Sequence, residues 1–167
     1  MIRGVITGFI LLFFQLLAFR DLILFERGFA FPYIVLLLFL PYSTNRVLLL
    51  FSGFAMGLLV DMFYDTPGIN AAACVLIMFL RPFWLDTTLG GNIEDNQRLN
   101  LGSLGFTWFF IYVVPLTLLH HLIIFFVEAG NTEMFWVTIT KVLYSTVYSV
   151  ICMFIFQFLF AYEGKKV

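Results

Sequence analysis

The chain has 167 residues and a net charge of −1, and 62% of its residues are hydrophobic while only 11% are charged. Ordinary soluble domains have about a quarter charged residues, so this chain has too few polar groups to cover an aqueous surface. The charge also excludes the basic surface of a nucleic-acid-binding protein. Cys74 and Cys152 lie inside apolar stretches, without the spacing of a metal site or a disulfide framework. We therefore predict an all-α integral membrane protein with a single transmembrane domain.

Charged residues and turn signals divide the chain into six apolar stretches. The first, from about residue 4 to residue 24, follows Arg3 and is longer than the hydrophobic region of a secretory signal peptide. No small-residue cleavage site follows it, so we predict that it is retained as a helix. The second, 29–42, has roughly fourteen residues and is short for a membrane span, so we expect it to tilt in a locally thinned bilayer.

Turn signals also separate the later helices. The polar turn 43–45 is a ready N-cap for the third helix, and Asp-Thr-Pro-Gly at 65–68 is a strong turn signal after it. Pro82 is expected to end the fourth helix, and 85–103 form one hydrophilic loop. Pro115 is expected to kink the fifth helix. The third to sixth helices are predicted at about 46–64, 69–82, 104–127 and 134–162. Together with the first two, they give a six-transmembrane-helix bundle.

The lysine and arginine residues predict the orientation of this bundle. With the N-terminus in the cytoplasm, six basic residues fall on the cytoplasmic side and two on the outside, as the positive-inside rule requires. Six helices then return the C-terminus to the cytoplasm as well. The cytoplasmic residues are Arg3, Arg46, Arg81, Arg98, Lys165 and Lys166, and the outer ones are Arg20 and Arg27.

Four ionisable residues inside the predicted helices are candidates for function, because a charge in hydrocarbon costs about 2.5 kcal/mol or more. From the helical rise, Asp61 lies about 22 Å from the cytoplasmic end and Lys141 about 10 Å below the outer surface, in a core about 30 Å thick. His120 and His121 lie in the same outer half. One interpretation is a buried polar cluster with an ion pair between Asp61 and Lys141. In the other, Lys141 extends outward to the surface and the histidines lie near the lipid headgroups.

The third predicted helix has one marked face. Gly53, Gly57 and Asp61 recur every four residues, so they share that face. The Gly-x-x-x-Gly pattern is typical of a surface that another helix approaches closely. The neighbouring helix belongs either to the same bundle or to a partner protein.

Signatures of enzymes and of cofactor or metal sites are not recognisable in the sequence, and we predict a non-enzymatic protein without cofactors. His120 and His121 are adjacent, so their side chains point about 100° apart and do not suit one shared metal ion. Asp61 and Asp65 could form a catalytic pair. However, Asp65 lies in a Pro-Gly turn, where a capping or turn-forming role is expected.

The segment Gly53–Ala71 resembles the signature of MreD, the family of rod shape-determining membrane proteins. That signature has a glycine, an aspartate four residues later, an aromatic or aliphatic pair, a proline-containing turn, and an Asn-Ala or His-Ala entry to the next helix. Asp65 departs from it, because many members have a small residue there. The matching positions here are Gly57, Asp61, Phe63, Pro67, Gly68, Asn70 and Ala71.

The resemblance implies a component of the bacterial cell-elongation machinery in the cytoplasmic membrane, binding the bitopic protein MreC. Through MreC it would be linked to the MreB filament and to the peptidoglycan glycosyltransferase and transpeptidase. It also implies a fold similar to the substrate-binding subunits of energy-coupling-factor vitamin transporters. Two alternatives remain: a substrate-capturing transporter subunit with a polar cavity open to the outside, and a small membrane enzyme acting on a lipid carrier.

Overall fold

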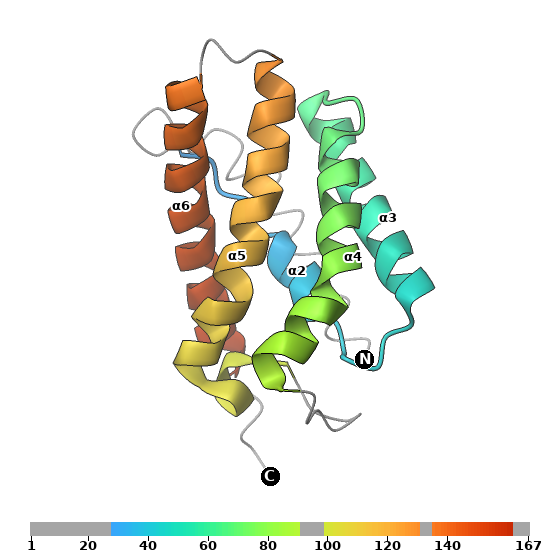
Figure 1. The fold of residues 1–167 in the computed structure, drawn as a ribbon, viewed down its shortest axis with the longest axis vertical. Coiled ribbons are helices and arrows are strands. Elements are labelled where there is room, and N and C mark those ends of the chain that lie inside the picture. The colour runs from blue at the N-terminus through green and yellow to red at the C-terminus, as the bar shows by residue number, and fades with distance from the viewer. Residues whose placement is uncertain (1–27, 91–98, 131–134, 162–167) are drawn as a thin grey trace.

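The computed structural model describes residues 28–90, 99–130 and 135–161 of the chain. This part is helical and contains a short helix, α2, followed by four long helices that alternate in direction (Figure 1). The four long helices are long and apolar enough to cross a membrane, which identifies the chain as a helical membrane protein. The helices are α2 (Ile34–Leu38), α3 (Arg46–Tyr64), α4 (Ile69–Leu89), α5 (Leu101–Ala129) and α6 (Phe135–Ala161).

The predicted first helix, 4–24, lies outside the described residues, so the count of six helices stays a prediction. The third predicted helix has the same bounds as α3, and the sixth agrees with α6 to within one residue at each end. The Asn45 side chain accepts a hydrogen bond from the backbone N–H of Val47, as expected of an N-cap.

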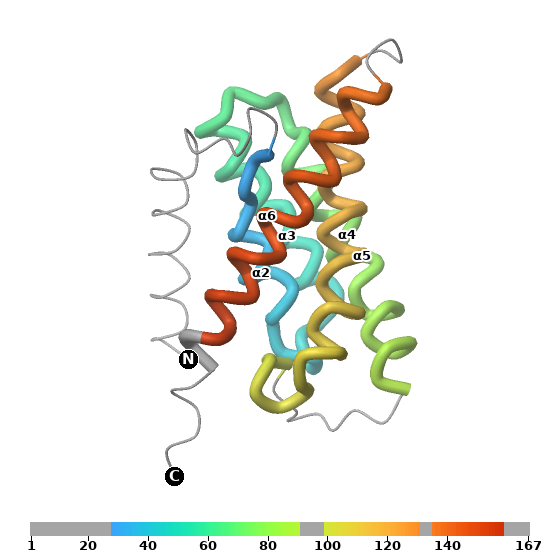
Figure 2. Tube along the Cα trace, turned by 90° about the vertical axis from the view of Figure 1, so that its left-hand side faces the viewer, coloured from blue at the N-terminus to red at the C-terminus, as the bar shows by residue number. Residues whose placement is uncertain are grey.

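The prediction of a continuous helix over 29–42 is wrong. Only five residues, those of α2, are α-helical, and the residues on either side form turns and irregular backbone. The segment runs lengthwise beside the long helices in both views, from near α6 to the start of α3 (Figures 1 and 2). An irregular chain rises up to about 3.3 Å per residue, against 1.5 Å in a helix. Partial extension, rather than tilt in a thinned bilayer, therefore lets so short a segment cover this length.

Two other predicted boundaries are also wrong. α4 does not end at Pro82 but continues to Leu89, because Leu85 beyond the proline is fully buried in the core and its packing outweighs one lost backbone hydrogen bond. Residues 85–89 of the predicted loop 85–103 therefore belong to α4, which is followed by the left-handed Gly90, and residues 91–98 of that prediction lie outside the described residues. α5 begins at Leu101 and contains a non-helical residue, Gly105, near the predicted start of the fifth helix.

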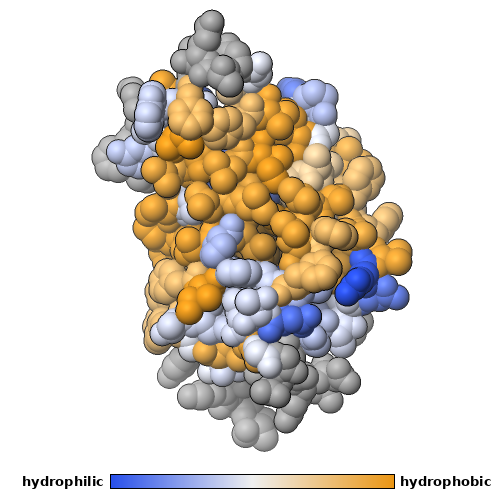
Figure 3. Space-filling model, in the orientation of Figure 1, coloured by the Kyte–Doolittle hydropathy of each residue, from blue (hydrophilic) through white to orange (hydrophobic). Residues whose placement is uncertain are grey.

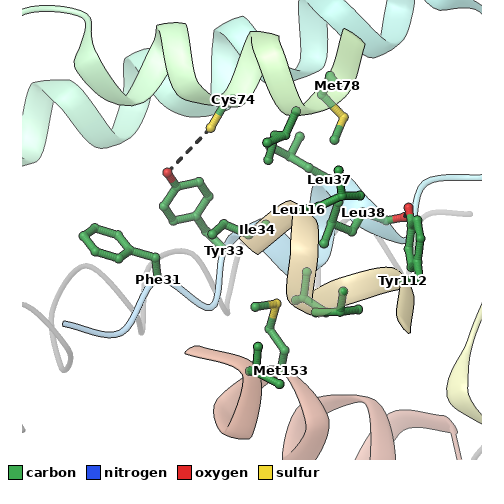
Figure 4. Close-up of a cluster of buried hydrophobic side chains, with 14 of the residues drawn as sticks. Phe31, Tyr33, Ile34, Leu37, Leu38, Cys74, Met78, Tyr112, Leu116 and Met153 are labelled. Carbon is green, nitrogen blue, oxygen red and sulfur yellow. Dashed lines mark hydrogen bonds between the residues drawn. The ribbon is translucent and has the colours of Figure 1, made fainter. Parts of the chain in front are cut away.

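The core of the bundle is built around α2. Its side chains point between the long helices, so the short helix is surrounded by protein (Figure 4). By contrast, the outward faces of the long helices carry many exposed aliphatic and aromatic side chains, and Figure 3 shows them as a broad apolar surface. The buried set includes Ile34, Leu37 and Leu38 of α2, Cys74 and Met78 of α4, Tyr112 and Leu116 of α5, and Met153 of α6.

Candidate functional site

Asp61, the last buried residue of α3, caps the beginning of α4. Its Oδ1 accepts hydrogen bonds from the backbone N–H of Asn70 at 2.9 Å and from Asn70 Nδ2 at 3.0 Å. Its Oδ2 accepts from the backbone N–H of Ala71 at 2.9 Å. The residue at the N-cap position of α4 is Gly68, which has no side chain to do this. A carboxylate from the preceding helix therefore satisfies two of the free N–H groups at the helix start and lies at the positive end of its dipole.

The turn between the two helices closes around the same carboxylate. Thr66 Oγ1 donates a hydrogen bond of 2.5 Å to Asp61 Oδ1, and the Asn70 side chain also donates to Thr66 Oγ1 at 3.1 Å. Asp65 is the C-cap of α3 with φ of 53°, and Gly68 has φ of 80°. These left-handed residues reverse the chain on either side of the exposed Pro67. Asp65 is exposed and forms the turn rather than pairing with Asp61.

Gly53 and Gly57 lie against α4 of the same chain. A Cβ atom added at Gly57 would lie 2.4 Å from Ala71 Cα and 2.6 Å from the carbonyl oxygen of Asn70, both backbone atoms. At Gly53 it would lie 2.8 Å from Met78 Cγ and 3.0 Å from the carbonyl oxygen of Cys74. The marked face of α3 is thus a packing face within the bundle, and it brings Asp61 to the start of α4.

A chain of buried polar side chains leads from Asp61 to α5. Asn70 links Asp61 to Tyr33, whose hydroxyl donates to Asn70 Oδ1 at 3.3 Å. The Tyr33 oxygen also lies 2.8 Å from His120 Nε2, within hydrogen-bonding distance. The thiol of Cys74 donates to the Tyr33 oxygen at 3.5 Å (Figure 4). The chain therefore joins α3, α4, the start of α2 and α5 through the interior of the bundle.

His121 points away from this chain, toward α6. Its Nδ1 is hydrogen-bonded to Thr146 Oγ1 at 3.2 Å and its Nε2 to Ser149 Oγ at 3.4 Å. The two histidine rings are 5.5 Å apart between centroids with an interplanar angle of 83°, as expected for neighbours on a helix. Ser149 Oγ also accepts a hydrogen bond of 2.9 Å from the backbone N–H of Phe31. Within the described ranges, no group of three His, Cys, Asp or Glu residues could hold a metal ion.

The other end of α2 is held by a buried arginine. Arg81 Nε donates to the carbonyl oxygen of Leu38 at 3.1 Å and to the Tyr112 hydroxyl at 3.0 Å, and its Nη2 donates to the carbonyl of Leu40. Tyr112 in turn donates to the Leu38 carbonyl at 2.7 Å. A cation is favourable at the negative end of a helix, and these carbonyls have no partners in a continuing helix. Arg81, which the sequence pattern assigns to the cytoplasmic surface, is instead part of the core.

The predicted buried cluster is therefore formed in part. Asp61 and His120 are joined through two intermediates, and His121 lies beside His120 but bonds to α6. Lys141 is half-buried on α6, and among the described residues no ion pair joins it to Asp61. Donors from the α3–α4 turn surround the carboxylate in its place.

Four residues of this network could not be recognised from the sequence: Tyr33, Arg81, Tyr112 and Ser149. Their hydrogen-bond partners are 28 to 120 residues away in the chain, so no local pattern connects them. The one available signal was Arg81, a charge inside an apolar stretch that a helix passing through Pro82 would place in the membrane.

No protein-family model, curated protein or solved structure matches this chain.

Replacing Ser149 by alanine should destabilise the protein by about 2 kcal/mol, because the buried N–H of Phe31 would lose its acceptor. Thermal unfolding in mild detergent measures the loss. The matched control is Ser52→Ala, since the Ser52 hydroxyl donates only to the Leu49 carbonyl of its own helix. A melting temperature for Ser149→Ala equal to that of the control would contradict the proposed support of the α2 segment by α6.

Proposed function

We propose that this protein is a non-enzymatic component of the bacterial cell-elongation machinery, of the MreD type. It would lie in the cytoplasmic membrane with both termini in the cytoplasm and bind an MreC-like bitopic protein. Through that partner it would help to organise the MreB filament and the peptidoglycan glycosyltransferase and transpeptidase during lateral wall synthesis. In this proposal the transmembrane helices provide a surface to which other proteins bind, and the chain catalyses no step itself.

The observation that carries the proposal is the mutual contact of the signature residues. Gly57 admits the backbone of Ala71, Asp61 accepts from Asn70 and Ala71, and Gly68 reverses the chain between them. A chance run of similar residues has no reason to interlock in this way. The interlocking supports the resemblance to MreD, because most of the matching residues have a role in building one helical hairpin.

A second observation favours a scaffold over a substrate-capturing transporter subunit. Such a subunit needs polar groups that face an open cavity. The polar side chains here bond mainly to one another or to the backbone of α2, whereas the groove between α3 and α4 described below is lined by apolar side chains. One atom favours the alternative: His120 Nδ1 is buried and has no hydrogen-bond partner among the described residues.

The test is co-purification of the full chain from its own membrane after extraction in mild detergent. We expect an MreC-like bitopic protein to remain bound, and Asp61→Asn to reduce its recovery only as far as it reduces the amount of folded protein. Capture of transporter ATPase subunits, with no protein of the elongation machinery, would overturn the proposal and support the transporter alternative.

A further inference from the structure

An apolar groove runs along the outer surface between α3 and α4, on the side away from α2. It has a volume of about 600 Å³. Gly68 and Ala72 leave its floor without large side chains, while Phe54 and Leu58 of α3 and Phe79 of α4 form its walls. Since every lining residue is apolar, the groove suits a hydrocarbon occupant.

The groove continues toward the first residue of α3. A second, smaller hollow shares Leu50 and Phe79 with the groove and is closed by Arg46, Pro82 and Phe83. From Arg46 to Leu58, the helical rise gives a length of about 18 Å. That length is close to one leaflet of a hydrocarbon core about 30 Å thick.

A cation stands at one end of this apolar path. Arg46 is exposed, and its guanidinium carbon lies over the Phe83 ring, 5.5 Å from the ring centre. No ion pair of Arg46 is present among the described residues. The single acidic residue of α4, Asp86, accepts a hydrogen bond from Tyr42. The predicted orientation places this end of α3 at the cytoplasmic headgroups.

We propose that the groove binds an anionic phospholipid of the cytoplasmic leaflet, with one acyl chain between α3 and α4 and its phosphate on Arg46. Charge complementarity selects this occupant, because an arginine at headgroup depth, with no ion pair among the described residues, can bind a phosphate through paired N–H donors. The positive end of the α3 dipole adds to the attraction. The site is independent of the partner named above, so the purified chain alone is sufficient for the test.

The experiment compares thermal unfolding of the full chain in detergent with added phosphatidylglycerol or phosphatidylcholine of identical acyl chains. We expect phosphatidylglycerol to raise the melting temperature by about 3 °C more than phosphatidylcholine does. Arg46→Gln, a change at an exposed residue, should abolish this difference. Lys141→Gln removes a cation on α6 and should keep the difference unchanged.

A second measurement tests the acyl chain. Native mass spectrometry should detect one retained phosphatidylglycerol on the wild-type protein and a large loss of it on Ala72→Leu, which fills the floor of the groove. Equal effects of the two lipids on the wild type, a full preference in Arg46→Gln, or retention of the lipid by Ala72→Leu would each overturn the proposal. Crosslinking of Ala72→Cys to another protein's helix in the native membrane, with no lipid retained, would also overturn it and assign the groove to a protein.

Discussion

Gly57→Ala adds a single methyl group, yet we expect a net loss of about 2 kcal/mol in the free energy of unfolding. In an exposed helix the same change would stabilise by roughly 0.5–1 kcal/mol, because glycine loses more backbone entropy on folding. Here the new methyl carbon would lie 2.4 Å from Ala71 Cα. Backbone on both sides cannot move aside as a side chain can, so α3 and α4 must separate, and overpacking costs about 1–3 kcal/mol or more.

Thermal unfolding in detergent, followed by the fraction that stays monodisperse on gel filtration, measures this effect. Gly53→Ala should cost less, because the nearest atom there is Met78 Cγ in a flexible side chain. Phe51→Ala, at a side chain that is 65% exposed on the same helix, is the control that should melt close to the wild type. A Gly57→Ala protein more stable than the wild type would show that the two helices are not in tight contact.

Asp61→Asn should cost about 3 kcal/mol although it changes only one atom of the side chain. Both carboxylate oxygens accept hydrogen bonds, and three different residues supply the donors. An amide offers one accepting oxygen and turns an NH₂ group toward the remaining donors. At least one buried donor is then unsatisfied, and the loss is larger because the missing acceptor was charged.

The measurement is again thermal unfolding, together with hydrogen exchange at the first turn of α4, where the N–H groups of Asn70 and Ala71 should lose protection. Asp65→Asn is the matched control, because Asp65 is exposed and asparagine adopts its left-handed conformation readily. Equal protection in Asp61→Asn and the wild type would contradict the capping role.

The parts of the fold that the sequence predicted well depend on local signals. α3 begins at an asparagine cap and ends at a Pro-Gly turn, and both signals lie within a few residues of the boundaries they predict. The close packing at Gly57 also has a local signal, because small residues at a spacing of four share one face. Helix boundaries and close packing of this kind are determined by residues that lie near them in the sequence.

The parts that were predicted wrongly depend on distant contacts. A fourteen-residue apolar stretch gives no sign that α2 is short, because the groups that satisfy its neighbouring backbone come from α4, α5 and α6. The ion pair between Asp61 and Lys141 was inferred from depth alone. Depth along a helix does not determine which way a side chain points around the helix axis. One donor from the adjacent turn and three from the start of α4 bind the carboxylate instead of Lys141.

The interrupted α2 segment has a consequence for how the protein is made. A segment released alone into lipid must satisfy its own backbone polar groups, as a continuous helix does. Around α2, acceptors and donors come from Ser149, Arg81 and Tyr112, which leave the ribosome later. We therefore expect the α2 segment to stay at the translocon or the membrane surface until α6 has been synthesised. Truncation before α6 should accordingly yield a protein that is cleared by membrane proteases rather than a smaller stable bundle.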